Sequence, residues 1–138
     1  MSKTFQLEIV TPERVEVSMA VTSIRAPAMG GYVGILANHA PMVSSLDVGE
    51  IRIRTDDAET VFATSGGFLE VSNNVCTVLA DSIEHAEKID VERAEQAMQR
   101  ARERLSTVLP DVDQARAEAA LKRAINRLRI AKEGRHGS

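Results

Sequence analysis

The chain has 138 residues, enough for one domain or for one domain with an appendage. Its formal net charge of -3 argues for neither nucleic acid nor a membrane surface as a partner, and no apolar stretch approaches the ~20 residues that span a bilayer. Aromatic residues are scarce (three Phe, one Tyr, no Trp), so an aliphatic core of modest stability is expected, which favours a chain that is completed by a partner.

Short strands are predicted along the chain up to about Ser82. Phe5, Leu7 and Ile9 alternate with polar residues, as in a strand that is buried on one face, and Thr11-Pro12 ends this run. The stretch 15–19 repeats the alternation. Further strands are expected at 22–26, 32–36, 42–46, 51–54, 61–64, 68–71 and 75–80.

Turn residues separate these strands at intervals of roughly eight to twelve residues. Gly30-Gly31 and Asp56-Asp57 predict turns, and Gly66-Gly67 predicts a tight bend or a bulge. Asn73-Asn74 is suited to the positive φ angles of a hairpin turn. Short strands separated by turns at these intervals are typical of an antiparallel sandwich or barrel.

The chain changes character at Asp90, which is a suitable N-cap for a helix. An apolar stripe at helical spacing follows, and Pro110 ends that helix. A second helix begins after Asp111 or Asp113, either of which is placed to cap it. The first stripe comprises Val91, Ala94, Met98, Ala101, Leu105 and Val108, and the second comprises Ala117, Leu121, Ala124, Leu128 and Ala131.

The expected fold class is therefore mainly β plus α. We expect an N-terminal antiparallel β-sandwich in residues 1–86, followed by a C-terminal antiparallel two-helix hairpin in residues 87–138. Alanine-rich stripes let helices approach closely but bury little apolar area, so the hairpin should separate at small cost. Such a marginal unit is suited to regulation.

Charge is unevenly distributed along the chain. Residues 1–113 hold 18 of the 20 Asp and Glu, whereas residues 114–138 hold 7 of the 17 Lys and Arg and only two acids. A basic terminal helix on an acidic body indicates an acidic protein partner for that helix, and a merely solvated face is the alternative. Membrane surface and nucleic acid fit poorly, because bulky apolar anchors and interleaved aromatic residues are lacking.

No residue set in the chain is suited to catalysis. A general base such as His39 needs an oriented partner and a nucleophile, and the local candidates are only Ser44 and Ser45, with no acid before Asp47. The segment 30–34 lacks the Lys-Ser/Thr of a phosphate-binding loop. We therefore expect no enzyme activity.

The remaining histidines and the cysteine carry no metal signal. His85 and His136 have no ligand-like spacing with each other or with Cys76, so no metal site is expected. Cys76 lies in a strand-like run and is expected to be a small buried hydrophobic side chain.

In their order and spacing, these features resemble the ε subunit of bacterial and chloroplast F-type ATP synthases over essentially the whole chain. The strongest segment is Gly34-Ile35-Leu36-Ala37-Asn38-His39-Ala40-Pro41, which is similar to the family's G-I-L-x-x-H-A-P run. Gly49-Glu50-Ile51-Arg52, Gly66-Gly67-Phe68 and Ala124-Ile125-Asn126-Arg127-Leu128 support the match.

The resemblance implies a non-catalytic rotor subunit of the central stalk that couples proton translocation to ATP synthesis. Its ten-stranded β-sandwich would bind the γ subunit and sit on the ring of c subunits. Its hairpin would rise along γ, meet the α/β catalytic subunits and block ATP hydrolysis. The expected location is the cytoplasmic face of the bacterial inner membrane, with membrane contact only through the complex. Candidate contacts with γ or the c ring are Gly31, Tyr32, Val33, His39 and Pro41, and the inhibitory basic helix would use Arg116, Lys122, Arg123, Arg127 and Arg129.

The segment Ile89-Asp90-Val91-Glu92-Arg93-Ala94 matches an I/L-D-x-x-R-A motif that binds ATP in some members of the family. Asp90 is suited to accept a hydrogen bond from the adenine amino group, and the arginines to surround a triphosphate. The alternative is a capped helix start with solvated arginines. ATP is thus a candidate regulatory ligand, no cofactor is required, and a free-standing ATP-sensing module is the alternative function. The candidate ATP-binding residues are Ile89, Asp90, Arg93, Ala94, Arg100, Arg123 and Arg127.

Overall fold

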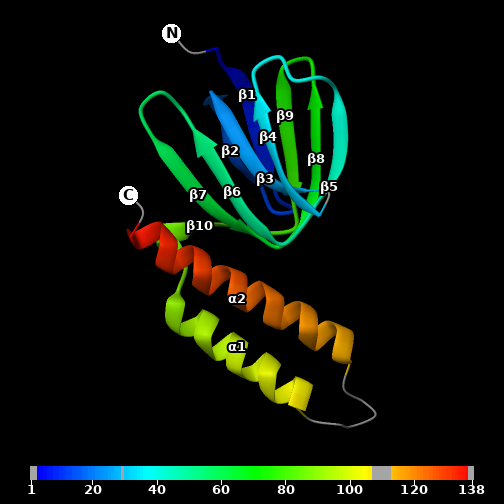
Figure 1. Ribbon diagram of the computed structural model, residues 1–138, viewed down its shortest axis with the longest axis vertical. Coiled ribbons are helices and arrows are strands. Elements are labelled where there is room, and N and C mark those ends of the chain that lie inside the picture. Colours follow the sequence, from blue (N-terminus) through cyan, green and yellow to red (C-terminus); the bar gives the residue numbers. More distant parts are fainter. Residues whose placement is uncertain (1–2, 29, 107–112, 137–138) are drawn as a thin grey trace. The chain divides into compact units, whose positions relative to one another are not determined.

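The computed structural model describes residues 3–28, 30–106 and 113–136 (Figure 1). The chain divides into two compact units, Met1–His85 and Ala86–Ser138. The first unit is a β-sandwich and the second is a pair of helices. The predicted fold class is confirmed.

Ten strands form the first unit, and all the predicted strands are present. Hydrogen bonding links nine of them in the order β10-β7-β6-β3-β5-β8-β9-β1-β2. The tenth strand, β4, lies outside this path and pairs with β3. Only Ala28 and Leu46 pair between β3 and β5, so the sheet folds over there into two layers. The strands are β1 (Phe5–Val10), β2 (Val15–Val21), β3 (Ser23–Ala28), β4 (Gly31–Leu36), β5 (Met42–Leu46), β6 (Gly49–Arg54), β7 (Glu59–Thr64), β8 (Gly67–Ser72), β9 (Val75–Ala80) and β10 (Ile83–His85).

The sandwich differs from the predicted antiparallel one at a single pair of strands. β1 and β9 run parallel, with Leu7 opposite Cys76 and Ile9 opposite Val78. All the other strand pairs are antiparallel. Alternation of apolar residues shows that a strand has one buried face. It does not show which distant strand becomes its neighbour, or whether the two run parallel or antiparallel.

The core lies between the two layers and is almost entirely aliphatic. Phe5, Leu7 and Ile9 of β1 are buried as their alternation predicts. In β2, the same alternation leads to burial only in part, since Val17 packs partly against the core while Val15 is 60% and Met19 is 41% exposed. A register shift after Ile9 pairs Val15 with Val10 on the outer face, and Met19 lies on an edge strand that pairs with β1 alone.

Both predicted special turns are present. Asn73 and Asn74 have φ angles of 51° and 61°, as a tight hairpin between β8 and β9 requires. Gly66 and Gly67 have φ angles of 118° and 141°, and a Cβ atom on Gly67 would lie 2.0 Å from the carbonyl oxygen of Leu79. Only glycine therefore allows β8 to start in register with β9.

Cys76 is fully buried in β9, as the sequence predicts, and burial raises the pKa of its thiol from 9.0 to about 12. The thiolate fraction at neutral pH therefore falls about a thousandfold. We expect Cys76 to react with a thiol reagent such as DTNB at least about a thousandfold more slowly in the native chain than in urea. Stopped-flow absorbance measures both rates, and fast labelling of the native chain would contradict the buried placement.

The second unit consists of a 3-10 turn (Ala86–Lys88), α1 (Val91–Ser106) and α2 (Gln114–His136). The backbone N–H of Arg93 donates to Asp90 Oδ1 over 3.0 Å, which confirms Asp90 as an N-cap. For α2, Asp113 is the cap, since its Oδ1 accepts from the N–H of Arg116 over 3.0 Å. Pro110 and Asp111 lie outside the described residues.

The two helices pack against each other through their small residues. Ala94 and Ala101 of α1 are buried, as are Ala117, Ala124 and Ala131 of α2. Val91, Met98 and Leu105 are half-buried, and Val108 lies outside the described residues. Within the described part of the chain, neither helix is long and apolar enough to cross a membrane.

Candidate functional site

Exposed apolar side chains form a row across the outer face of the layer that contains β8, β9, β1 and β2. Phe68 pairs with Leu79 across β8 and β9, Leu79 is aligned with Val10 of β1, and Val10 pairs with Val15 of β2. We call these four residues, of which Val10 is half-buried, the outer strip. We include Val43 on β5, which pairs with Glu70 and lies diagonally from Phe68. Phe68 is 60%, Leu79 52% and Val43 75% exposed. Contiguous exposed apolar residues of this size are typical of a protein-docking surface.

A hollow of about 280 Å³ lies against the outer strip and is lined by three of its residues, Val10, Phe68 and Leu79. Its walls include Phe68 and Leu79, and Thr11-Pro12 closes one side. The turn that ends β1 thus has a second role, because it forms a recess beside the strip in which an anchoring side chain of a partner can be buried. The lining residues are Val10, Thr11, Pro12, Phe68, Leu79, Ala80 and Asp81.

The His39–Pro41 segment forms the turn between β4 and β5, and Asn74 holds it in place. Asn38 adopts a φ of 64°, and its N–H donates to Asn74 Oδ1 over 2.7 Å. Asn74 Nδ2 in turn donates to the carbonyl of Thr4 over 3.1 Å. His39 is half-buried, with Nδ1 2.7 Å from the carbonyl oxygen of Ala40, and Pro41 is exposed. His39 is therefore a hydrogen-bonded loop residue.

The other candidate contact segment, Gly31–Val33, lies at the opposite end of β4. Gly31 and Tyr32 are exposed, with Tyr32 at 45%, whereas Val33 packs partly against the core. β4 separates this segment from His39 by about 17 Å at ~3.3 Å per residue. The candidate contacts named from the sequence thus form two patches at opposite ends of one strand.

Tyr32 has a neighbour that sequence inspection missed. The guanidinium of Arg25, on β3, lies over the Tyr32 ring with its carbon 4.2 Å from the ring centroid. Tyr32 pairs with Pro27, two residues from Arg25 on the same face of the sheet. The pairing of β3 with β4 places Arg25 diagonally opposite Tyr32, within reach of a long side chain.

In the helical unit, the two apolar residues of the I/L-D-x-x-R-A motif have structural roles. Ile89 and Ala94 are buried at 1% and 0% exposure, and Asp90 uses one carboxylate oxygen as the cap of α1. Arg93 and Arg100 are exposed on α1. The motif therefore supplies an anchored helix start, with Arg93 and Arg100 at the surface.

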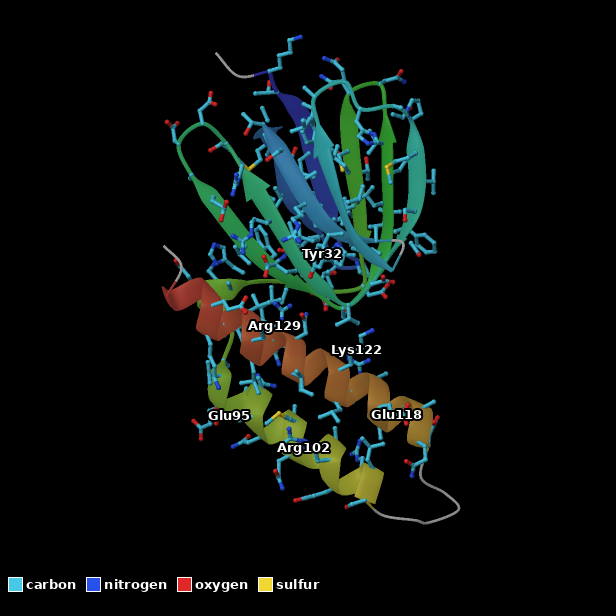
Figure 2. All side chains as sticks on the ribbon, in the orientation of Figure 1. Tyr32, Glu95, Arg102, Glu118, Lys122 and Arg129 are labelled. Carbon is cyan, nitrogen blue, oxygen red and sulfur yellow. The ribbon has the colours of Figure 1, made fainter. Side chains whose placement is uncertain are left out.

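The basic residues of α2 are mostly at the surface. Arg116, Lys122, Arg123 and Arg129 are exposed, whereas Arg127 is half-buried. Arg129 is engaged locally, because its guanidinium donates to Glu133 over 3.4 Å and to Asn126 over 3.1 Å. Figure 2 shows Lys122 and Arg129 along α2 and Glu95 and Arg102 on α1.

Metal-binding side chains do not gather anywhere in the described part of the chain. Among those residues, no group of three or more His, Cys, Asp and Glu is placed to hold a metal ion.

Comparison with known families covers nearly the whole chain. The beta-sandwich domain of the ATP synthase delta/epsilon chain matches residues 4–86, and the long alpha-helix domain of the same chain matches residues 87–132. The chain belongs to this family. The similarity to the ε subunit that the sequence motifs indicated is thus confirmed.

Individual relatives agree with the family assignment. An ATP synthase epsilon chain from Desulforamulus reducens is 47% identical over 131 residues, which cover 95% of this chain and 99% of the relative. One from Symbiobacterium thermophilum is 48% identical over 126 residues, with 91% of each chain covered.

Solved structures share the fold. A chain in the cryo-EM structure of the Euglena gracilis mitochondrial ATP synthase (OSCP/F1/c-ring) matches with a TM-score of 0.80 and 22% identity, over 89% of this chain and 78% of that chain. A chain in the Tetrahymena thermophila central stalk and c-ring structure matches with a TM-score of 0.63 and 15% identity, over 96% and 97% of the two chains.

Proposed function

We propose that this ATP synthase delta/epsilon family member is a non-catalytic rotor subunit of the central stalk. Through its β-sandwich it binds the γ subunit and the c ring, and so couples proton translocation to ATP synthesis. The α/β subunits carry the chemistry. The observation that carries the proposal is the outer strip, because a sandwich whose core is complete has no internal reason to expose Phe68, Leu79 and Val43 together.

The two ends of β4 fit this role as auxiliary contacts. We place the γ subunit on the outer strip, with the His39–Pro41 turn as a neighbouring contact. The Gly31–Tyr32 turn is then the contact for the c ring. In such an assembly the chain lies at the cytoplasmic face of a bacterial inner membrane and touches lipid only indirectly.

The helical hairpin is proposed to inhibit ATP hydrolysis. Most of the residues buried in α1 and α2 are alanines, each of which buries little apolar area, so we expect the pair to open at modest cost. The exposed cations of α2 fit an acidic segment of the catalytic subunits. This part of the proposal rests on Arg116, Lys122, Arg123, Arg127 and Arg129.

Truncation after Lys88 tests inhibition by the hairpin. A γ-containing catalytic head should hydrolyse ATP severalfold faster with the truncated chain than with the full chain, because the cations that contact the catalytic subunits are removed. Steady-state ATPase assays, with both forms shown to be bound, measure the ratio. Arg123→Ala with Arg127→Ala in the full chain should give part of the same increase. Equal rates for all three forms would leave the hairpin without an inhibitory role.

ATP is the proposed regulatory ligand of the hairpin, and it would hold α1 against α2. Calorimetric titration of the full chain with ATP should give saturable binding that weakens about tenfold or more in the Arg123→Gln, Arg127→Gln variant, because two charge-assisted contacts to phosphate are lost. Arg102→Gln, an exposed arginine of α1 outside the candidate set, is the matched control. No heat signal at millimolar ATP would remove ATP from the proposal. A chain that binds ATP but not γ would instead be a free-standing ATP-sensing module.

A further inference from the structure

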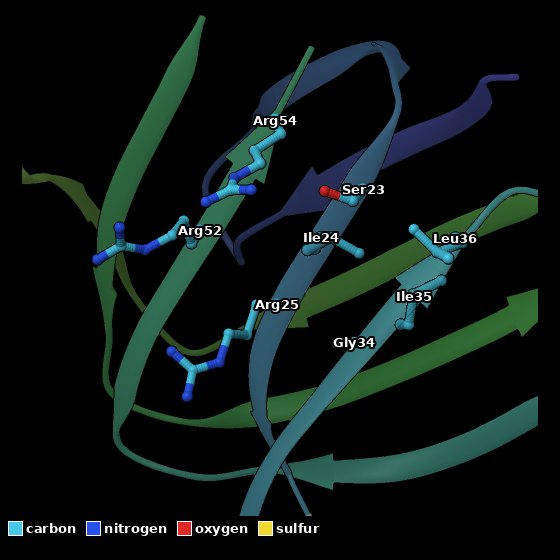
Figure 3. A pocket seen from close by; sticks show the side chains of 8 residues that line it. All are labelled: Ser23, Ile24, Arg25, Gly34, Ile35, Leu36, Arg52 and Arg54. Carbon is cyan, nitrogen blue, oxygen red and sulfur yellow. The ribbon is translucent and has the colours of Figure 1, made fainter. Parts of the chain in front are cut away.

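The second outer face of the sandwich, formed by β3, β4 and β6, carries a hollow of about 430 Å³ (Figure 3). Strand register places three arginines on this face, since Arg25 pairs with Arg52 and Ser23 pairs with Arg54. Figure 3 shows the arginine side chains extending from β3 and β6, with Leu36 on β4. The lining residues are Ser23, Ile24, Arg25, Gly34, Ile35, Leu36, Arg52 and Arg54.

Two of the three arginines are already neutralised. Arg52 donates to Glu50 and to Glu59, each over 2.7 Å, and Arg54 donates to the second oxygen of Glu59. These contacts raise the pKa of Arg52 and lower the pKa of Glu59, so the Arg52–Glu59 pair stays ionised. Three guanidinium groups against two carboxylates leave the hollow with one net positive charge.

Arg25 carries that remaining charge. It is exposed, and among the described residues no carboxylate lies within ion-pair distance of its guanidinium. The guanidinium lies over the Tyr32 ring, with its carbon 4.2 Å from the ring centroid. A planar guanidinium presents a fork of N–H donors that a carboxylate binds with two hydrogen bonds.

The surroundings of Arg25 favour an amphipathic ligand. Gly34, which pairs with Arg25, has no side chain and leaves open space where a Cβ atom would lie. Leu36, at 65% exposure, and Tyr32, at 45%, are the apolar groups on either side of it on β4. A ligand that binds here therefore has room beside the cation and apolar surface within reach.

We propose that this hollow binds a single side-chain carboxylate, flanked by an apolar residue, from an acidic loop of a protein partner. One net positive charge matches one carboxylate, whereas a phosphate group, with nearly two charges, needs more free cations than the hollow holds. The site is on a different face from the outer strip, so it does not depend on docking of the γ subunit there.

Titration of the isotope-labelled full chain with short peptides tests the proposal by NMR. The probe is N-acetyl-Leu-Asp-Leu-amide, and the same peptide with Asn in place of Asp is its neutral counterpart. Amide shifts should be confined to β3, β4 and β6, should saturate in the millimolar range with the Asp peptide only, and should weaken with added salt. Equal shifts with the Asn peptide would overturn the carboxylate assignment. So would tighter binding of inorganic phosphate at the same residues.

Three variants isolate the role of Arg25. Arg25→Gln should weaken binding of the Asp peptide about fivefold or more, because the charged fork is lost. Arg25→Lys keeps the charge but loses the stacked fork, and should give an intermediate loss. Arg14→Gln, which removes an exposed arginine outside the hollow, should have no effect. A loss as large in Arg14→Gln as in Arg25→Gln, or no loss in Arg25→Gln, would overturn the proposal. Arg25 and Arg14 are both exposed, so spectra of the three free variants should match the unaltered chain elsewhere.

Discussion

Replacing Phe68 and Leu79 together with serine is expected to weaken binding of the γ subunit by about a hundredfold or more, because a few central residues that become desolvated carry most of the binding energy of an interface. The two residues pair directly across β8 and β9 and share the hollow of about 280 Å³. Both point outward, so the core is untouched and the variant should keep its free energy of unfolding within about 1 kcal/mol. Surface plasmon resonance with immobilised γ measures the affinity.

The matched control is Ile125→Ser, which removes a 44% exposed aliphatic side chain from α2. It should leave γ affinity within about twofold, as surface substitutions outside an anchor cluster do. In reconstituted vesicles, the Phe68→Ser, Leu79→Ser chain should also fail to restore proton-driven ATP synthesis. If the double variant binds γ as tightly as the unaltered chain, or if Ile125→Ser is equally damaging, the outer strip is not the γ-binding surface.

Gly67→Ala is expected to destabilise the sandwich by about 4 kcal/mol or more, or to prevent folding, because steric overlap and backbone strain act together. The added methyl group would lie 2.0 Å from the Leu79 carbonyl oxygen, and the φ of 141° is accessible to glycine almost alone. Neither problem is relieved by a side-chain rotation, because the obstructing atoms belong to the backbone of β9. Urea denaturation followed by circular dichroism measures the free energy of unfolding.

Labelling of Cys76 provides a local measure of the same effect. Cys76 pairs with Val71, so it reports on the β8–β9 strand pair that begins at Gly67. Its reaction with DTNB should accelerate about tenfold for every ~1.4 kcal/mol of stability lost. Gly31→Ala is the control, because nothing lies within 4 Å of a Cβ atom there and no positive φ is required. It should change stability by less than about 1 kcal/mol. Similar losses in the two variants would contradict a specific steric role for Gly67.

Local physical rules made most of the elements predictable from sequence. Alternation identified the buried face of β1, and Asn73-Asn74 identified a hairpin turn, because few residues other than glycine accept its φ angles. Asp90 was recognisable as an N-cap, because capping depends on a carboxylate and an N–H three residues apart. For α2, sequence left two caps open, and the geometry assigns the role to Asp113.

The short strand β10 was not predicted, because no local rule identifies it. Its three residues, Ile83–His85, are too few for an alternation to be visible, and their extended conformation depends on pairing with β7. The candidate site was predictable only in part, since motifs named the two ends of β4 but not the outer strip between distant strands.

The sequence alone located most of the strands, turns and helices, because alternation, capping and positive φ angles act within a few residues. The tertiary structure was needed to show that β1 runs parallel to β9, which places Val10 beside Leu79 and extends the Phe68–Leu79 hairpin pair into an exposed row. Each of these contacts depends on which strands become neighbours. Burial of the whole core and closure of the loops between strands decide which strands become neighbours. No pattern within a few residues contains that information.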